Sequence, residues 1–183
     1  DLTNEYSVLV PTKDADYWKP ANPNFTVRTI NYDNYSFGEQ LGFKRFLEKL
    51  SPDLVHFCMP QQPVLYKGKS VTTFHDLSLM NTYNSDKNWL VYHAKQQVGK
   101  FVFKKVLKDA NHIIAVSEYT KSDVREFFPI DEKKISVIYE SSDVSNIKPK
   151  RYSVPYKKYI LYVGQQSDYK NIKRLGDAHQ ILL

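Results

Sequence analysis

The chain contains near its middle the stretch His112-Ile113-Ile114-Ala115-Val116-Ser117, in which Ile113 to Val116 are all apolar. A strand that is apolar on both faces is typical of a parallel sheet covered by helices on both sides. Segments with helical periodicity precede and follow it, at residues 88–108 and 118–128. Ser117 stands where the second of these helices needs an N-cap. This order predicts βαβ units and therefore an α/β fold.

The same alternation of strands and helices extends toward both ends of the chain. Short β-branched or aromatic runs predict further strands at residues 5–11, 25–31, 53–58, 70–75, 135–140 and 159–164. Further helices are predicted at 37–50 and from 171 onward. In the helix at 88–108 the periodicity places Val98, Phe101, Val102 and Val106 along one side. The predicted architecture is a Rossmann-like, doubly wound, mainly parallel sheet.

The organisation of the sequence indicates one domain and the beginning of another. Residues 1–143 hold most of the predicted elements, and residues 144–158 are polar, contain two prolines and show no periodicity, as expected of a linker. Residues 159–183 begin a new strand-turn-helix unit. We expect the chain to be truncated, because it stops inside an unfinished amphipathic helix.

Composition narrows the class of protein. Cys58 is the only cysteine, which excludes an intrachain disulfide and favours a cytoplasmic location. No stretch is long and apolar enough to cross a bilayer, and the first residues lack the pattern of a signal peptide. The net charge of +6 is dispersed, and its basic runs are too short to predict nucleic-acid binding. The charge leaves open a solvated basic surface or peripheral contact with an anionic membrane.

Several segments occur in the order found in a known enzyme family. Residues 52–56 read Pro-Asp-Leu-Val-His, and residues 71–77 read Val-Thr-Thr-Phe-His-Asp-Leu. Residues 114–123 then read Ile-Ala-Val-Ser-Glu-Tyr-Thr-Lys-Ser-Asp, and 134–139 read Lys-Ile-Ser-Val-Ile-Tyr before Asp143. The last segment, Tyr-Ile-Leu-Tyr-Val-Gly at 159–164, precedes Lys170-Asn171 and Leu175. Together these segments resemble glycosyltransferase family 4, a group of retaining enzymes with the two-domain GT-B fold.

The resemblance implies transfer of a sugar from a nucleotide-diphosphate-sugar donor to a saccharide or lipid-linked acceptor, without a metal ion or other cofactor. It also implies that the first strand, glycine-rich loop and helix of the family are absent, because the first glycine here is Gly38. Most of the donor domain is missing as well, so we expect this chain alone to be inactive. Gln165 stands where many members carry an arginine that holds the donor diphosphate.

His75 and Asp76 are the candidate catalytic residues. They follow a predicted strand, and open α/β sheets place ligands at the carboxyl ends of their strands. The resemblance implies that His75 faces the donor sugar, where it need not act as a general base. The alternatives are a structural histidine and an aspartate that caps the following turn.

Gly164, Lys170 and Asn171 are the candidate donor-binding residues. Glycosyl transfer needs fixed positive charge or a helix N-terminus at the leaving diphosphate. Lys170 lies in the turn before the helix that starts near Asn171, so its ammonium and the helix could meet at one phosphate. Without the family context, an exposed loop lysine is the better explanation of Lys170.

Other readings remain open at this point. The chain fits another GT-B enzyme, such as a nucleotide-sugar epimerase or a phosphorylase, and also a non-catalytic basic module that binds anionic lipid or nucleic acid. Asp14-Ala15-Asp16 matches the D-x-D of metal-dependent transferases, but a solvated turn explains it better, and we predict no metal site. A sheet without its first strand would have an unpaired edge or gap, which predicts marginal stability, dimerisation through that edge or a partner strand.

Overall fold

Six parallel strands form two separate sheets in the computed structural model, which describes residues 3–32, 36–81, 89–141, 153–156, 158–164 and 170–182. The strands are β1 (Tyr6–Pro11), β2 (Phe25–Ile30), β3 (Val55–Phe57), β4 (Ser70–Phe74), β5 (His112–Ala115) and β6 (Ile135–Val137). The helices are η1 (Thr12–Asp14), η2 (Gly38–Phe43), α1 (Lys44–Leu50), α2 (Ser78–Asn81), α3 (Trp89–Asp109), α4 (Glu118–Phe127), η3 (Glu132–Lys134) and α5 (Ile172–Ile181). None of these helices is both long and apolar enough to cross a bilayer.

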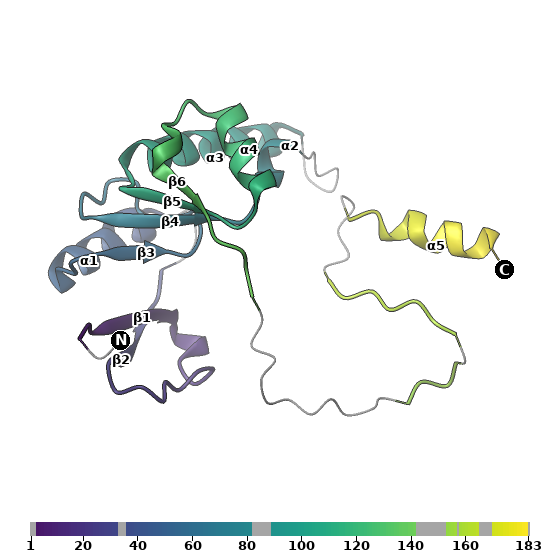
Figure 1. The fold of residues 1–183 in the computed structure, drawn as a ribbon, viewed down its shortest axis with the longest axis horizontal. Coiled ribbons are helices and arrows are strands. Elements are labelled where there is room, and N and C mark those ends of the chain that lie inside the picture. The colour runs from purple at the N-terminus through teal and green to yellow at the C-terminus, as the bar shows by residue number, and fades with distance from the viewer. Residues whose placement is uncertain are drawn as a thin grey trace.

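The described strands are divided between two sheets. One sheet contains β1 and β2, and the other contains β3, β4, β5 and β6 in that order. Within the described residues β1 pairs only with β2, and β3 pairs only with β4. Figure 1 shows the small sheet beneath the β3 side of the larger one. The predicted α/β class is correct, but the strands do not form one continuous sheet.

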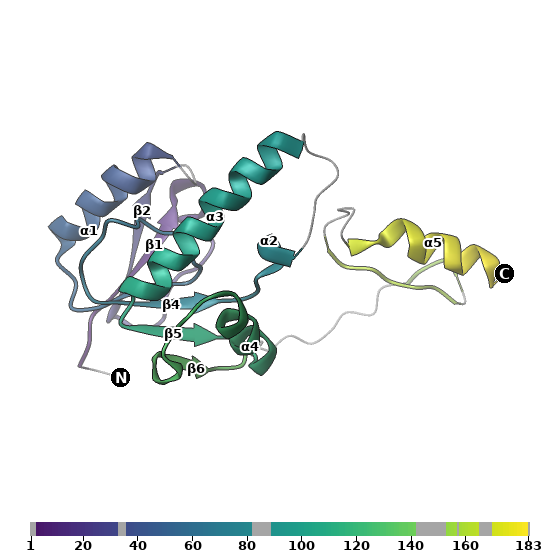
Figure 2. The same ribbon diagram turned by 90° about the horizontal axis from the view of Figure 1, so that it is seen from above.

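The main core lies between the larger sheet and its helices. Phe74 of β4 and Ile113 of β5 are fully buried, and the Phe74 ring meets Phe103 of α3 edge-on with centroids 5.4 Å apart. Val106 of α3 and Val124 of α4 belong to the same cluster. Figures 1 and 2 show α2, α3 and α4 together over one face of this sheet. α2 and α3 form the connection from β4 to β5, and α4 lies in the connection from β5 to β6, as βαβ units require.

A second apolar cluster joins the two sheets. Leu47 of α1 and Phe57 of β3 are buried in it, and Leu9 of β1 and Phe43 of η2 pack against them. The Phe43 and Phe57 rings meet edge-on, with centroids 6.4 Å apart. The predicted helix at 37–50 is present, but its first half is a π-helix. Side-chain packing, not backbone pairing, therefore attaches β1 and β2 to the rest.

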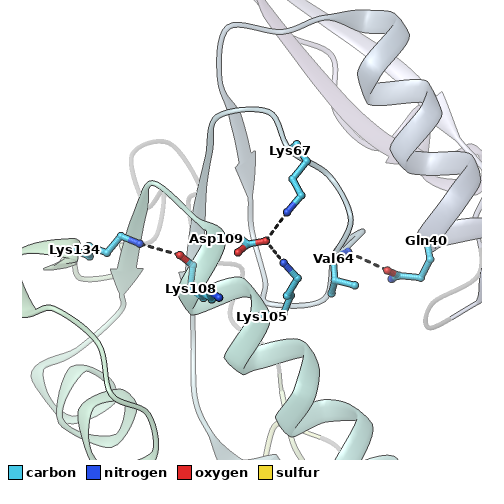
Figure 3. Close-up of polar contacts among 7 residues, drawn as sticks. All are labelled: Gln40, Val64, Lys67, Lys105, Lys108, Asp109 and Lys134. Atoms are coloured by element: carbon cyan, nitrogen blue, oxygen red, sulfur yellow. Dashed lines mark hydrogen bonds and ion pairs between the residues drawn. The ribbon is translucent and has the colours of Figure 1, made fainter.

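A side-chain amide also fastens η2 to the loop before β4. Gln40 Nε2 donates to the carbonyl oxygen of Gln62 at 3.1 Å, and Gln40 Oε1 accepts from the backbone N–H of Val64 at 2.9 Å. Figure 3 shows the second of these bonds. The Gln40 amide thus bonds one backbone C=O and one backbone N–H of the loop, as the backbone of a neighbouring strand would.

Lysines surround the last turn of α3, at the amino ends of the strands. Lys67 and Lys105 both bind Asp109 Oδ2, and Lys134 Nζ donates to the carbonyl oxygen of Lys108 at 3.1 Å (Figure 3). Bonding to Lys105 lowers the pKa of Asp109, with a smaller contribution from Lys67. The negative end of the helix dipole repels a carboxylate at the C-terminus of a helix. The two lysine partners of Asp109 offset this repulsion.

The strand predicted at residues 159–164 is wrong. These residues form no strand, and Ile160 and Val163 are 62% and 85% exposed. A β-prone run becomes a strand only when another strand pairs with it, and none of the described residues does so. The helix after it is present as α5, which stands apart from both sheets (Figure 1). Most of the predicted linker lies outside the described residues.

The contrast between β5 and residues 159–164 predicts the outcome of two matched substitutions. Ile113→Val removes a methylene from the core and should lower the free energy of unfolding by about 0.5–1.5 kcal/mol. Ile160→Val should change it by less than about 0.5 kcal/mol, because the side chain is exposed. Urea unfolding of both variants measures this. Equal losses would mean that residues 159–164 are buried.

The Asp109 cluster predicts a pH-dependent loss of stability. The pKa of Asp109 is lowered on folding from its ordinary 3.8, so its contribution is complete above that value and is lost as the pH falls through the folded pKa. At neutral pH, Asp109→Asn should cost about 0.5–1 kcal/mol, because solvent screens these partly exposed pairs. The difference from wild type should shrink in acid. Asp16→Asn, in an exposed loop, is the control; a pH-independent difference for Asp109→Asn would contradict the assignment.

Candidate functional site

The carboxyl ends of β3, β4, β5 and β6 lie along one edge of the larger sheet, because these strands are parallel and adjacent. Cys58 follows β3, His75 follows β4, Ser117 follows β5 and Glu140 lies three residues beyond β6. The predicted site residue His75 thus stands among residues from three other strands. Glu140 joins this group although no sequence motif marks it.

Both ring nitrogens of His75 have partners. Nε2 donates to the carbonyl oxygen of Cys58 at 2.8 Å, and Nδ1 lies 2.8 Å from Glu140 Oε1. The side chains of His75 and Glu140 are 47% and 65% exposed, so the pair is open to solvent. Each ring nitrogen therefore already faces an oxygen atom of the protein. A ligand that bonds the ring must first displace Glu140 or the Cys58 carbonyl.

A chain of hydroxyl groups holds the backbone of His75. Ser117 Oγ accepts from the backbone N–H of Thr120 at 3.0 Å, which confirms the predicted N-cap of α4. Thr120 Oγ1 donates to the carbonyl oxygen of His75 at 3.0 Å and lies 3.0 Å from Ser117 Oγ. The start of α4 therefore fixes the position of the candidate catalytic residue.

Asp76 forms a local bond next to His75. Its Oδ1 accepts from the backbone N–H of Ser78 at 2.8 Å, which satisfies a donor at the start of α2. This is the turn-capping geometry that sequence analysis considered as the alternative. The Asp76 side chain is thus committed to the turn that follows His75.

A buried polar network lies beside this edge and was not predicted. Gln61 Nε2 donates to Glu39 Oε1 at 2.9 Å, and Thr72 Oγ1 donates to Gln62 Oε1 at 2.9 Å. Glu39, Gln62 and Thr72 are all buried. These contacts orient the loop after β3. Cys58 at the start of this loop contacts His75 through its carbonyl oxygen. Polar residues in a loop give no sequence signal for such packing.

The predicted donor-binding residues lie at and before the start of α5. Asn171 is the N-cap, with φ 57° in the left-handed region that asparagine tolerates, and Lys170 precedes it. Gly164 has φ 151°, a backbone conformation that residues other than glycine rarely adopt. Figure 1 shows α5 away from the strand ends, so the structure does not bring these residues to His75. Gln165 lies outside the described residues.

Comparison with known proteins places the chain in a family. The profile of Glycosyltransferase Family 4 matches residues 5–146, which include every strand of both sheets and the His75 cluster. The chain belongs to glycosyltransferase family 4. This confirms the family that the sequence motifs indicated.

Curated relatives of this family 4 chain carry related names. It is 29% identical over 126 residues to the O-antigen chain mannosyltransferase B of Escherichia coli, covering 62% of this chain and 31% of that protein. It is 31% identical over 139 residues to the putative glycosyltransferase YtcC of Bacillus subtilis, covering 68% of this chain and 32% of that protein. The chain therefore spans about a third of the length of these relatives.

The N-cap of α4 predicts a site-linked loss of stability. Ser117→Ala removes the acceptor for the Thr120 N–H and should lower the free energy of unfolding by about 1 kcal/mol. Ser122→Ala, at an exposed position inside the same helix, should be neutral or raise it by a few tenths. Thermal unfolding of both variants gives the comparison. Similar values for the two would argue against the capping bond.

Proposed function

We propose that the whole protein transfers a hexose from a nucleotide-diphosphate sugar to a saccharide or lipid-linked acceptor, without a metal ion and with retention of anomeric configuration. The observation that carries this proposal is the oriented His75 at the shared edge of four strands in a family 4 chain. Some relatives are named O-antigen chain mannosyltransferases, which makes a mannosyl donor the first to test.

In this proposal the two parts of the chain hold different substrates. Residues 1–143 form the acceptor side, where His75 contacts the donor sugar and Asp76 supports it through the turn that it caps. Residues 144–158 form the linker. Residues 159–183 begin the donor domain, with Gly164, Lys170 and Asn171 at the diphosphate. The position of Lys170 before α5 supports this role, because helix N-termini attract anions.

We also propose that the whole protein fills the gap between the sheets. Both β1 and β3 have an edge without a partner among the described residues, and one apolar cluster contacts both strands. A further parallel strand between them would bond both edges and join the sheets. Without it, this chain would be marginally stable, would dimerise through these edges and would be inactive. The single cysteine favours the cytoplasm as the compartment.

An assay of the whole protein tests the reaction. Incubated with nucleotide-diphosphate sugars and saccharide or lipid-linked acceptors, it should release the nucleoside diphosphate only when an acceptor is present. EDTA should not change the rate, and NMR of the product should show the anomeric configuration of the donor. Conversion of the donor without an acceptor would indicate an epimerase, and dependence on inorganic phosphate would indicate a phosphorylase.

Two pairs of variants test the assigned residues. His75→Ala should lower kcat on the order of 100-fold, whereas His112→Ala, at the amino end of β5, should leave it nearly unchanged. Lys170→Ala should raise KM for the donor about tenfold, whereas Lys173→Ala in α5 should not. Equal effects within either pair would contradict the assignment of that residue.

A further inference from the structure

Glu39 is a buried carboxylate that no step of the proposed reaction uses. The residue is 6% exposed, although it belongs to the first turn of the π-helix η2. Burial of a carboxylate is unfavourable unless hydrogen bonds replace those lost to water. Gln61 Nε2 donates to Oε1 at 2.9 Å, and Gln40 Nε2 lies 3.4 Å from Oε2. The carboxylate therefore holds a loop residue that lies 22 positions further along the chain.

The loop that Gln61 belongs to is short and stiff at this point. Only Met59 and Pro60 separate Gln61 from Cys58, the first residue beyond β3. The proline ring fixes φ of Pro60, and the residue before a proline, here Met59, is restricted to extended conformations. Pro60 is also buried, so the segment has little room to move. A displacement of Gln61 is therefore passed on to the Cys58 carbonyl.

The Cys58 carbonyl oxygen is the backbone acceptor that orients the His75 ring. It accepts from Nε2 at 2.8 Å, whereas the other partner of the ring, Glu140, is an exposed side chain. The orientation of the ring follows the hydrogen bonds of its nitrogens, so it depends on where this carbonyl lies. Parallel pairing of β3 with β4 ends at Phe57, one residue earlier. Contacts of the loop therefore contribute to the position of the carbonyl.

The other anchors of the loop lie beyond Gln61, further from the site. Gln40 bonds two backbone groups that follow Gln61, and Gln62 Oε1 accepts from Thr72 Oγ1 of β4 at 2.9 Å. These bonds already attach η2 and β4 to the loop. Of the four anchoring bonds, the one from Glu39 is nearest in the chain to the carbonyl that His75 contacts.

We propose that Glu39 and Gln61 are positioning residues for His75. Their hydrogen bond fixes Gln61, the stiff segment carries this constraint to Cys58, and the Cys58 carbonyl fixes the Nε2 side of the ring. Nδ1 then keeps its direction when a ligand replaces its side-chain partner. Neither residue touches the ligand, so both act on catalysis through His75. The proposal rests on the proposed transfer reaction for its effect on kcat, whereas its effect on the ring follows from the contacts alone.

NMR of the His75 ring in this chain tests the positioning step without any reaction. Gln61→Met removes the donor and keeps the length of the side chain, and Gln97→Met, at an exposed position of α3, is the matched control. The nitrogen-15 signal of Nε2 should shift in Gln61→Met, because its bond to Cys58 weakens, and stay unchanged in Gln97→Met. Glu39→Met breaks the same bond from the other partner and should shift the signal in the same direction. Its absence in His75→Ala assigns the signal.

Kinetics of the whole protein separate positioning of the ring from a purely structural role. Gln61→Met should lower kcat about tenfold and change KM for the donor less than about twofold, because the ring is misplaced while the donor still binds. In a His75→Ala background the same substitution should lower kcat no further, because it acts through the ring. Glu39→Gln keeps an acceptor oxygen for Gln61 and should retain most of kcat. Gln97→Met should leave kcat unchanged in both backgrounds.

The two experiments fail in different ways. Circular dichroism and urea unfolding first establish that the variants fold. An unshifted His75 signal in folded Gln61→Met and Glu39→Met would overturn the proposal, and so would an equal loss of kcat with and without the His75 side chain. A shifted signal in a whole protein that transfers no sugar would support the positioning of the ring and contradict the proposed function instead.

Discussion

Parallel pairing of β3, β4, β5 and β6 is the constraint on which the rest of the structure depends. Parallel neighbours cannot be joined by a tight turn, so each connection must return along the sheet, and α3 and α4 make two of these returns. The returns lie over one face and form the main core there. The same constraint brings the carboxyl ends of all four strands to one edge, where His75 meets partners from β3, β5 and β6.

The attachment of β1 and β2 follows a different principle. Backbone pairing is cooperative along a ladder, whereas the cluster around Leu47 and the bonds of Gln40 are separate side-chain contacts. Among the described residues, the other edges of β1 and β3 have no strand partner. The small sheet should therefore open at lower free energy than the larger one, and hydrogen exchange would show this order.

Sequence could predict the strands and helices of the larger sheet because short apolar runs and 3.6-residue periodicity are local signals. It failed at residues 159–164, because strand formation depends on a partner that the run itself does not encode. It also failed to separate Val98 and Phe101 from Val102 and Val106, because periodicity identifies the apolar side of a helix and not how much of that side is covered. Glu140 was missed because it lies 65 residues from His75 and only the topology brings them together.

The His75 contacts explain how the ring can be oriented and still remain available. Two oxygen atoms fix the direction of the ring, but they differ in how easily a ligand can displace them from it. The Cys58 carbonyl belongs to a backbone held by β3, whereas Glu140 is a side chain that is 65% exposed. An exposed pair of this kind contributes about 0–1 kcal/mol, so another hydrogen-bond partner of Nδ1 can replace Glu140 at little cost. The ring keeps its orientation through Nε2 during that exchange, which makes Nδ1 the atom through which His75 would meet a ligand.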